Sequence, residues 1–242
     1  MIREIIFQRD EDNPEFAVPG FHPEMEAMKA IGIPVGFEPS DNAEQLFLRH
    51  CIIWNQDEFP EDDRFQNNWR IYQNTSRMSI FLPLIEDLSI PSVIVDRLDN
   101  NVIETIQRMG WKKAFIKNEV KSLWNMGEMA SVWPDTPLEQ MIKEYEKRRY
   151  NGKYVIRQFI DPKIFYNEER YWVLNGRIFH RSGIIPPEVQ EAAKRLEVLG
   201  SLYYTIDAVD GMIVEINPGV SSDRHGDNSP ELFASWWKAA FF

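Results

Sequence analysis

The feature that most constrains the fold is the stretch YTIDAVDGMIVEINPG, which occupies residues 204–219. The Asp-Gly pair at 210–211 is a strong two-residue turn signal, so residues 203–209 and 212–216 are predicted to form an antiparallel hairpin. Residues two apart on a strand point to the same face, so Glu215 and Asn217 project together. Asp207 on the partner strand can face them across the pair. The stretch therefore predicts a packed sheet that carries two carboxylates and an amide on one face.

These three side chains offer hard oxygen ligands. Mg²⁺ usually takes one or two carboxylates and completes its shell with phosphates and water, so Asp207, Glu215 and Asn217 would suit it. Their flanking residues are apolar, which indicates that the acids rise from a buried sheet. A solvated hairpin face with alternating acids would give the same pattern, and the residues alone leave both interpretations open.

The pattern of elements changes near residue 90. Residues 1–89 alternate strand and helix signals, with strands predicted at 4–8, 35–38 and 46–54, a helix at 23–31 and helical spacing over 65–88. Such a succession favours a small open parallel sheet. Residues 90–242 instead mix helices with strands and hairpins, predicted at 90–95, 99–109, 113–117, 137–150, 154–160, 169–180, 187–199 and 203–216. We therefore predict an α/β N-terminal lobe followed by an α+β domain. The apolar C-terminal segment ELFASWWKAAFF is predicted to be a core helix, with an oligomer contact left open.

Composition excludes several classes of protein. The formal charge of −11 and the pI of about 4.9 argue against a non-specific nucleic-acid binder. The single cysteine, Cys51, cannot form an intrachain disulfide and is expected to be an inert thiol in a buried strand, which fits a cytoplasmic protein. The four histidines lack metal-hydrolase spacing. No window approaches the roughly 20 apolar residues that span a bilayer, and the first residues do not read as a signal peptide.

Two basic positions stand out elsewhere. Lys117 closes the apolar strand KAFIK, where a lysine can reach a nucleotide phosphate as a point charge, although a surface lysine would look the same. Arg170 lies in the apolar strand ERYWVL, and Arg177 and Arg181 follow it along the predicted hairpin. A partly buried arginine usually has an anion or a carboxylate as its partner, so a ligand and a structural salt bridge are both open.

Taken in order, KAFIK, YVIRQFI, ERYWVLNGRIFH and IDAVDGMIVEINPG resemble the motifs of the ATP-grasp superfamily. The resemblance covers residues 90–223. It implies an ATP-grasp fold in which two subdomains, about 90–153 and 154–242, clasp the nucleotide. The lobe at 1–89 is similar to the small domain that precedes the grasp in this superfamily. The chain differs from many members in carrying Arg157 where they have a glutamate, and in having only Gly127 in its phosphate loop.

The resemblance implies specific site residues. Asp207, Glu215 and Asn217 would bind Mg²⁺, and Lys117 would contact the phosphates of ATP. Arg157, Gln158, Phe159 and Ile160 would line the adenine pocket, and Glu169 would lie near the ribose or hinge. Lys121 and Ser122 would belong to a loop that covers the phosphates, and Arg170 and Arg181 would face the transferred phosphate or the substrate carboxylate. The substrate would be bound by Ser221, Ser222, Asp223 and His225.

The function implied by the resemblance is an ADP-forming ligase that uses ATP and Mg²⁺ to join a carboxylate to an amine through an acylphosphate. Its substrates would be small molecules or peptides. Such chemistry requires no protein nucleophile, in agreement with the lack of a convincing Ser-His-Asp or Cys-His set. Two alternatives remain from the sequence, a phosphotransferase that stops at phosphorylation and a non-catalytic nucleotide-binding interaction protein. The oligomeric state is not predicted.

Overall fold

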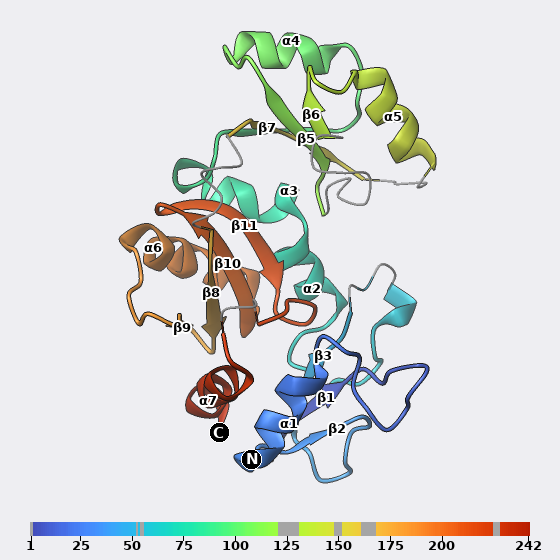
Figure 1. Cartoon of the computed structure of the whole chain (residues 1–242), viewed down its shortest axis with the longest axis vertical. Helices are drawn as coiled ribbons and strands as arrows, with labels where there is room; N and C mark the ends of the chain where they lie inside the picture. Colours follow the sequence, from blue (N-terminus) through green and yellow to red (C-terminus); the bar gives the residue numbers. More distant parts are fainter. Residues whose placement is uncertain are drawn as a thin grey trace.

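The computed structural model describes residues 2–51, 53, 56–120, 131–147, 152–160, 168–224 and 228–242. Three sheets follow one another along the long axis of the molecule, and the two termini lie close together at one end (Figure 1). Within the described residues, no helix is both long and apolar enough to cross a membrane.

The N-terminal sheet is small and wholly parallel, as predicted. Its order is β2 (Val35–Gly36), β1 (Arg3–Phe7), β3 (Gln45–Arg49), and helix α1 (His22–Ala30) connects the first two strands of the chain. The helix gives way at Gly32, whose φ of 77° suits a residue without a Cβ.

The third strand is shorter than predicted. It ends at Arg49 instead of continuing to residue 54, because the chain turns there to meet a distant loop, with His50 N donating to Val220 O at 2.9 Å. Cys51 is consequently exposed, which corrects the expectation of a thiol buried in a strand. A short 3₁₀ turn (Gln56–Glu58) follows.

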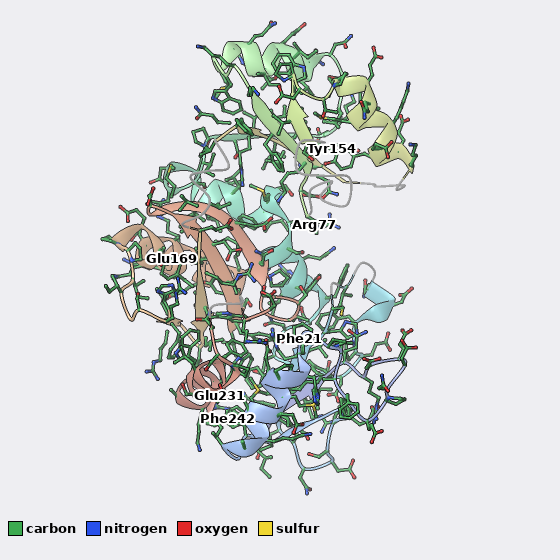
Figure 2. The ribbon with its side chains drawn as sticks, in the orientation of Figure 1. Phe21, Arg77, Tyr154, Glu169, Glu231 and Phe242 are labelled. Carbon is green, nitrogen blue, oxygen red and sulfur yellow. The ribbon has the colours of Figure 1, made fainter. Side chains whose placement is uncertain are left out.

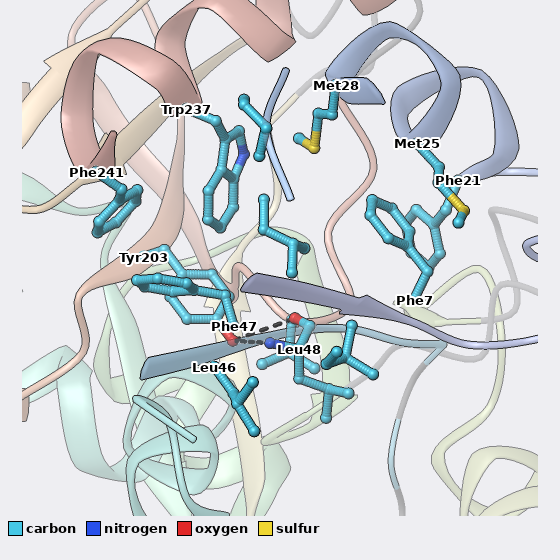
Figure 3. Close-up of a cluster of buried hydrophobic side chains, with 14 of the residues drawn as sticks. Phe7, Phe21, Met25, Met28, Leu46, Phe47, Leu48, Tyr203, Trp237 and Phe241 are labelled. Atoms are coloured by element: carbon cyan, nitrogen blue, oxygen red, sulfur yellow. Dashed lines mark hydrogen bonds between the residues drawn. The ribbon is translucent and has the colours of Figure 1, made fainter. Parts of the chain in front are cut away.

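The last helix, α7 (Pro230–Phe241), completes the core of this end of the molecule, as predicted for the apolar C-terminal segment. It begins at Ser229, whose side chain accepts a hydrogen bond from Leu232 N. Figure 3 shows Trp237 and Phe241 beside Phe47 of β3 and Tyr203 of the central sheet. The Tyr203 hydroxyl also bonds the backbone N–H and C=O of Leu48 (Figure 3). The first and last segments of the chain therefore share one core.

The central sheet is antiparallel, in the order β11 (Met212–Pro218), β10 (Tyr203–Val209), β8 (Glu169–Leu174), β9 (Arg177–Phe179). Both predicted turns form at residues with positive φ, Asn175 and Gly176 in one and Asp210 and Gly211 in the other. Helix α6 (Pro187–Leu196), extended by a 3₁₀ turn (Glu197–Leu199), packs on one face of the sheet.

The predicted helical stretch 65–88 also packs on this sheet, but in pieces. It forms α2 (Trp69–Ser76), α3 (Met78–Phe81) and two 3₁₀ turns (Leu82–Leu84 and Glu86–Leu88). The helix breaks at Arg77, which is extended with φ −102° and ψ 114°, and Pro83 prevents a regular continuation. The pieces bury Met78, Phe81, Leu82 and Ile85 in the same cluster as α6.

The third sheet lies at the far end of the molecule, under α4 (Asn101–Arg108) and α5 (Leu138–Lys147) (Figure 1). Its order is β4 (Ser92–Val95), β7 (Tyr154–Gln158), β5 (Ala114–Asn118), β6 (Val132–Trp133), all antiparallel. The two-residue β6 was not predicted. Strand β7, which opens the second predicted subdomain, is an inner strand of this sheet. The predicted domain limits stay a prediction.

Alternation along β5 and β7 gives this third sheet two different faces. Ala114, Ile116 and Ile156 pack under the helices. Lys117, Val155 and Arg157 occupy the alternate positions, and Val155 joins the core cluster of the central sheet. The two sheets are also joined through the backbone, because Ile90 N donates to Ile213 O at 3.2 Å. The interface between the two sheets, called the seam below, therefore contains the polar side chains of Lys117 and Arg157 beside Val155.

Candidate active site

The three predicted magnesium ligands converge on one face of the central sheet. Asp207 lies directly opposite Glu215 in the β10–β11 register, and the register shifts immediately after Asp207. Asn217 Nδ2 donates to Asp207 Oδ2 at 3.0 Å and to Glu215 Oε2 at 3.3 Å. Asp207 and Asn217 are buried, whereas a quarter of the Glu215 side chain is exposed. The period of two in the sequence thus led to the correct grouping.

Arg170 belongs to the same group, through the neighbouring strand. It is the register partner of Asp207 on β8, and it forms a bidentate pair with it, Nε to Oδ1 and Nη2 to Oδ2, each 2.8 Å. Its third nitrogen, Nη1, donates to Asp223 Oδ1 at 2.6 Å. Burial disfavours the charged guanidinium, but the bonds and charges of Asp207, Asp223 and Glu215 outweigh it and raise the pKa of Arg170. Arg170 therefore keeps its charge in the site.

Lys117 reaches the group from the other sheet. Its Nζ lies 2.6 Å from Glu215 Oε1, and only 5% of its side chain is exposed. Since Lys117 is near the end of β5 and Glu215 is on β11, this ion pair spans the seam between the two sheets. Its burial excludes the alternative of a surface lysine, and its contact with the phosphates of ATP stays a prediction.

One member of the group was not predicted. Glu168 directly precedes β8, and its pKa is raised to about 7 by burial and by the negative charges of Asp207 and Glu215. The sequence contained a signal for it, the EER run at 168–170, in which the residue two before Arg170 shares its face. Strand alternation favours Glu168 for this position.

Two predicted residues are not brought to this group. Glu169 is on the opposite face of β8 from Arg170 and accepts a hydrogen bond from the Tyr171 hydroxyl at 2.7 Å. His180 Nε2 lies 3.7 Å from its other oxygen. Figure 2 marks Glu169 at the edge of the central sheet beside α6. Arg181 is exposed next to His180. Strand alternation separates Glu169 from Asp207, and the expected roles of Glu169 at the ribose or hinge and of Arg181 at the phosphate or substrate stay predictions.

The expected adenine segment occupies the end of β7. Arg157 is buried and donates to Ser92 Oγ at 3.2 Å and contacts Met78 Sδ at 3.4 Å, and burial lowers its pKa. The N–H groups of Gln158 and Phe159 already donate to Pro91 O and Lys113 O. Gln158 is exposed, and Phe159 and Ile160 are half-buried. Backbone recognition of adenine by these residues stays a prediction, and the N–H groups of Gln158 and Phe159 are unavailable for it.

The expected substrate residues lie in the loop that follows Asn217. Ser222 is buried and donates to Pro218 O at 2.9 Å, so its hydroxyl shapes the loop. Ser221 is half-buried, and Asp223 is exposed and holds Arg170. Lys121, Ser122 and His225 lie outside the described residues.

The donor set fits magnesium by type, with two carboxylates and an amide side chain on a single face. Among the described residues, no group of three or more His, Cys, Asp or Glu side chains is arranged to hold a metal ion, and this set has only two side chains of those types beside Asn217. In this structure Asp207 is paired with Arg170, Glu215 is paired with Lys117, and Asn217 turns its Nδ2 toward both acids. A cation would fit here once Lys117 leaves Glu215, which requires another anion for the lysine.

No protein-family model matches the sequence, and no curated protein is similar to it in sequence. Solved structures do match over nearly the full length. The macrocyclase MdnC bound with precursor peptide MdnA from Microcystis aeruginosa MRC is 11% identical, with a TM-score of 0.57 and coverage of 97% of this chain and 99% of that one. The D-alanine–D-alanine ligase from Bacillus anthracis is 11% identical, with a TM-score of 0.57 and coverage of 99% and 97%.

A third match is the ATP-grasp ligase PsnB complexed with a minimal precursor, Mg and ADP, which is 11% identical, with a TM-score of 0.56 and coverage of 98% and 97%. At these identities the likeness concerns the fold. The chain therefore has the ATP-grasp fold, which the order of its motifs predicted.

Proposed function

We propose that this protein is an ATP- and Mg²⁺-dependent ligase that joins a carboxylate to an amine and releases ADP. The observation that supports it best is the seam between the sheets, where Lys117 pairs with Glu215 and Arg170 pairs with Asp207. A structural salt bridge needs one cation and one anion, whereas here two acids that share the Asn217 amide are each paired with a cation, and two further acids, Asp223 and Glu168, interact with the same group. The structural neighbours, an ATP-grasp ligase, a macrocyclase and a D-alanine–D-alanine ligase, support the same reaction class.

The residues have distinct roles in this proposal. Lys117 would bind the phosphates of ATP in place of Glu215, since a lysine is a mobile point charge. Asp207, Glu215 and Asn217 would then hold Mg²⁺, which when bound neutralises charge on the phosphates. Arg170 has its fork fixed by Asp207, and its Nη1 could exchange Asp223 for an anionic substrate group.

The chemistry follows from these positions. An oxygen of the substrate carboxylate attacks the γ-phosphorus of ATP, the bond to the β,γ-bridging oxygen breaks, and ADP leaves. The resulting acylphosphate is attacked by the amine, which expels phosphate and loses a proton to form the amide. The chain contributes positioning and positive charge at Lys117 and Arg170, without a covalent intermediate on the protein.

The internal ion pairs predict how ligands bind. Mg²⁺ alone would have to enter beside Lys117 and Arg170, so it is expected to bind weakly without nucleotide. Thermal unfolding with ATP, Mg²⁺ or both tests this, because a ligand at a hundredfold excess over Kd stabilises the native state by about 2.7 kcal/mol. We expect a clear rise in Tm only with Mg-ATP, and none for Glu215→Ala. An unchanged Tm in the wild type with every combination would refute the proposal.

A second experiment tests the ligation step. ADP release is measured with panels of amino acids or peptides as carboxylates, with and without an amine. A ligase should need both partners for rapid turnover and form an amide product. Turnover that is complete without an amine and yields a stable phosphorylated product would identify a phosphotransferase instead.

A further inference from the structure

Glu119 is a second buried carboxylate close to Lys117, and the proposed reaction does not use it. It directly follows β5, and its side chain is 2% exposed. It accepts hydrogen bonds from Arg77 Nη1 at 3.2 Å, from the Ser79 hydroxyl, and from Lys153 N at 3.3 Å. A carboxylate so far from water is stable only when its oxygens are well satisfied, and these donors come from two separate parts of the chain.

The donor Arg77 forms the break between α2 and α3, and the donor Ser79 lies in the first turn of α3. Met78, between them, donates its N–H to Glu119 O at 2.9 Å, and its sulfur contacts Arg157 of β7. Three consecutive residues of the break therefore hold two neighbouring strands of the third sheet. Figure 2 labels Arg77 at the level where the central sheet meets the third sheet.

The same break is fixed to the metal-ligand strand from its other side. Helix α2 packs against β11, and Met78 lies in one core cluster with Ile213 and Ile216, the neighbours of Glu215 along that strand. Glu119 thus connects β5, which carries Lys117, to the helices that pack on β11, which carries Glu215. Through these contacts, Glu119 is tied to both strands that carry the Lys117–Glu215 ion pair.

We propose that Glu119 is a positioning residue that holds Lys117 at the phosphate-binding point of the site. Glu119 lies one residue past β5 and two residues after Lys117, so in extended chain the two positions are about 6.6 Å apart. Glu119 also fixes the end of β5 to β7, because its N–H donates to Lys153 O at 2.9 Å. A shift of this strand end would move Lys117 with it. The inference rests on the proposed function, since it takes Lys117 to be a ligand of ATP.

The test is the affinity for Mg-ATP, measured by calorimetry on the whole protein. Glu119→Gln keeps the shape of the side chain but puts a donor opposite Arg77 or Ser79, so we expect Kd to rise about tenfold. Ser79→Ala removes one donor and keeps the charge, and it should raise Kd about twofold to threefold. Glu104→Gln is the matched control, since Glu104 is an exposed residue of α4 over the same sheet and should leave Kd unchanged.

A double-mutant cycle separates positioning from a general effect on folding. If Glu119 acts through Lys117, adding Glu119→Gln to Lys117→Met should raise Kd no further than Lys117→Met alone. If Glu119→Gln raises Kd by the same factor in the Lys117→Met variant as in the wild type, the inference is overturned. Wild-type affinity in the single variant Glu119→Gln would also overturn it. If Glu119→Gln does not fold, the Ser79→Ala cycle with Lys117→Met decides the question in the same way. A wild type that does not bind Mg-ATP would overturn the proposed function and the inference with it.

Discussion

Two sets of buried ion pairs in this molecule differ in what surrounds them. In the N-terminal core, Arg49 Nη2 pairs with Glu24 Oε2 at 2.6 Å, and neither side chain has any exposed surface. The guanidinium also lies over the rings of Phe21, Trp172 and Phe233. At the candidate site, Lys117 and Arg170 pair with carboxylates that keep some contact with solvent or with a polar neighbour.

These surroundings distinguish the core pair, which has a structural role, from the site pairs, in which the cations can exchange a carboxylate for a ligand. Arg49 also donates to Gly219 O, so the core pair fixes the loop after β11 to the N-terminal sheet. Within the described residues, Glu24 Oε1 and Arg49 Nε have no hydrogen-bond partner, and nothing else can replace the pair. Burial raises the pKa of Glu24 in spite of the opposing charge of Arg49. At the candidate site, in contrast, Arg170 bonds two carboxylates, one of them exposed, and a quarter of the Glu215 side chain that Lys117 holds is exposed.

The largest expected effect comes from breaking the core pair. Arg49→Met leaves Glu24 buried without its cation, which should lower the free energy of unfolding by about 3–5 kcal/mol. Chemical denaturation measures this directly. The control is Arg49→Met with Glu24→Leu, which removes both charges and should be more stable than the single variant. Equal stabilities of the single variant and the wild type would contradict a structural role.

Much of the fold could be predicted because it depends on local signals. The turns at 175–176 and 210–211 form where Asn-Gly and Asp-Gly stand, and strand alternation correctly grouped Asp207, Glu215 and Asn217. Arg49 shows what could not be predicted. A charged residue that ends an apolar strand looks exposed in the sequence, and only its tertiary partners, Glu24 and Gly219, account for its burial.

The place of Glu168 beside the Asp207 group could not be predicted for a similar reason. The choice between Glu168 and Glu169 depends on the face of β8 that each occupies, and the sequence contains both in one run. The break at Arg77 was missed because apolar spacing continues through it, while its extended backbone is stabilised by Glu119, forty-two residues away. Hydrophobic periodicity carries no information about contacts between residues that lie so far apart in the sequence.

A smaller loss of stability is expected from a substitution at Gly219, in the loop after β11 that packs against Tyr203. A Cβ added to Gly219 would lie 2.6 Å from Tyr203 Cδ2 and 2.7 Å from Tyr203 O. Gly219→Ala should therefore shift Tyr203 or the loop and destabilise the fold by about 1–3 kcal/mol. Gly20→Ala in the same end of the molecule is the matched control, because nothing lies within 4 Å of its Cβ. If both variants unfold at the same denaturant concentration, the loop is not held as tightly as described.

Lys117→Met tests the ion pair at the candidate site, for comparison with the core pair Arg49–Glu24. Glu215 remains partly exposed and keeps its bond from Asn217, so unfolding of the ligand-free protein should change by only about 1–2 kcal/mol. The Kd for Mg-ATP should rise at least about tenfold, equivalent to about 1.4 kcal/mol. Calorimetry and denaturation on the same preparation give both values. A large loss of stability with unchanged affinity would make Lys117–Glu215 a structural pair like Arg49–Glu24.

The smallest effect concerns Glu168, whose pKa of about 7 lies above the ordinary glutamate value. The folded state binds a proton at this residue between about pH 4.5 and pH 7 that the unfolded chain has released, so wild-type stability falls as pH rises through this window. Glu168→Gln cannot ionise and escapes that loss. Its free energy of unfolding relative to wild type should therefore increase from pH 5 to pH 8, by about 1–2 kcal/mol once solvent screening of this half-buried group is included.

Denaturation in a chelating buffer at several pH values gives this difference, and groups that titrate equally in both proteins cancel. Glu169→Gln is the control, because Glu169 faces Tyr171 and His180 instead of the acidic group. A difference that stays constant from pH 5 to pH 8 would mean that Arg170 and Arg157 hold Glu168 ionised throughout this range, so that the site carries a further permanent carboxylate. An increase would mean that the negative charges of Asp207 and Glu215 hinder the ionisation of Glu168.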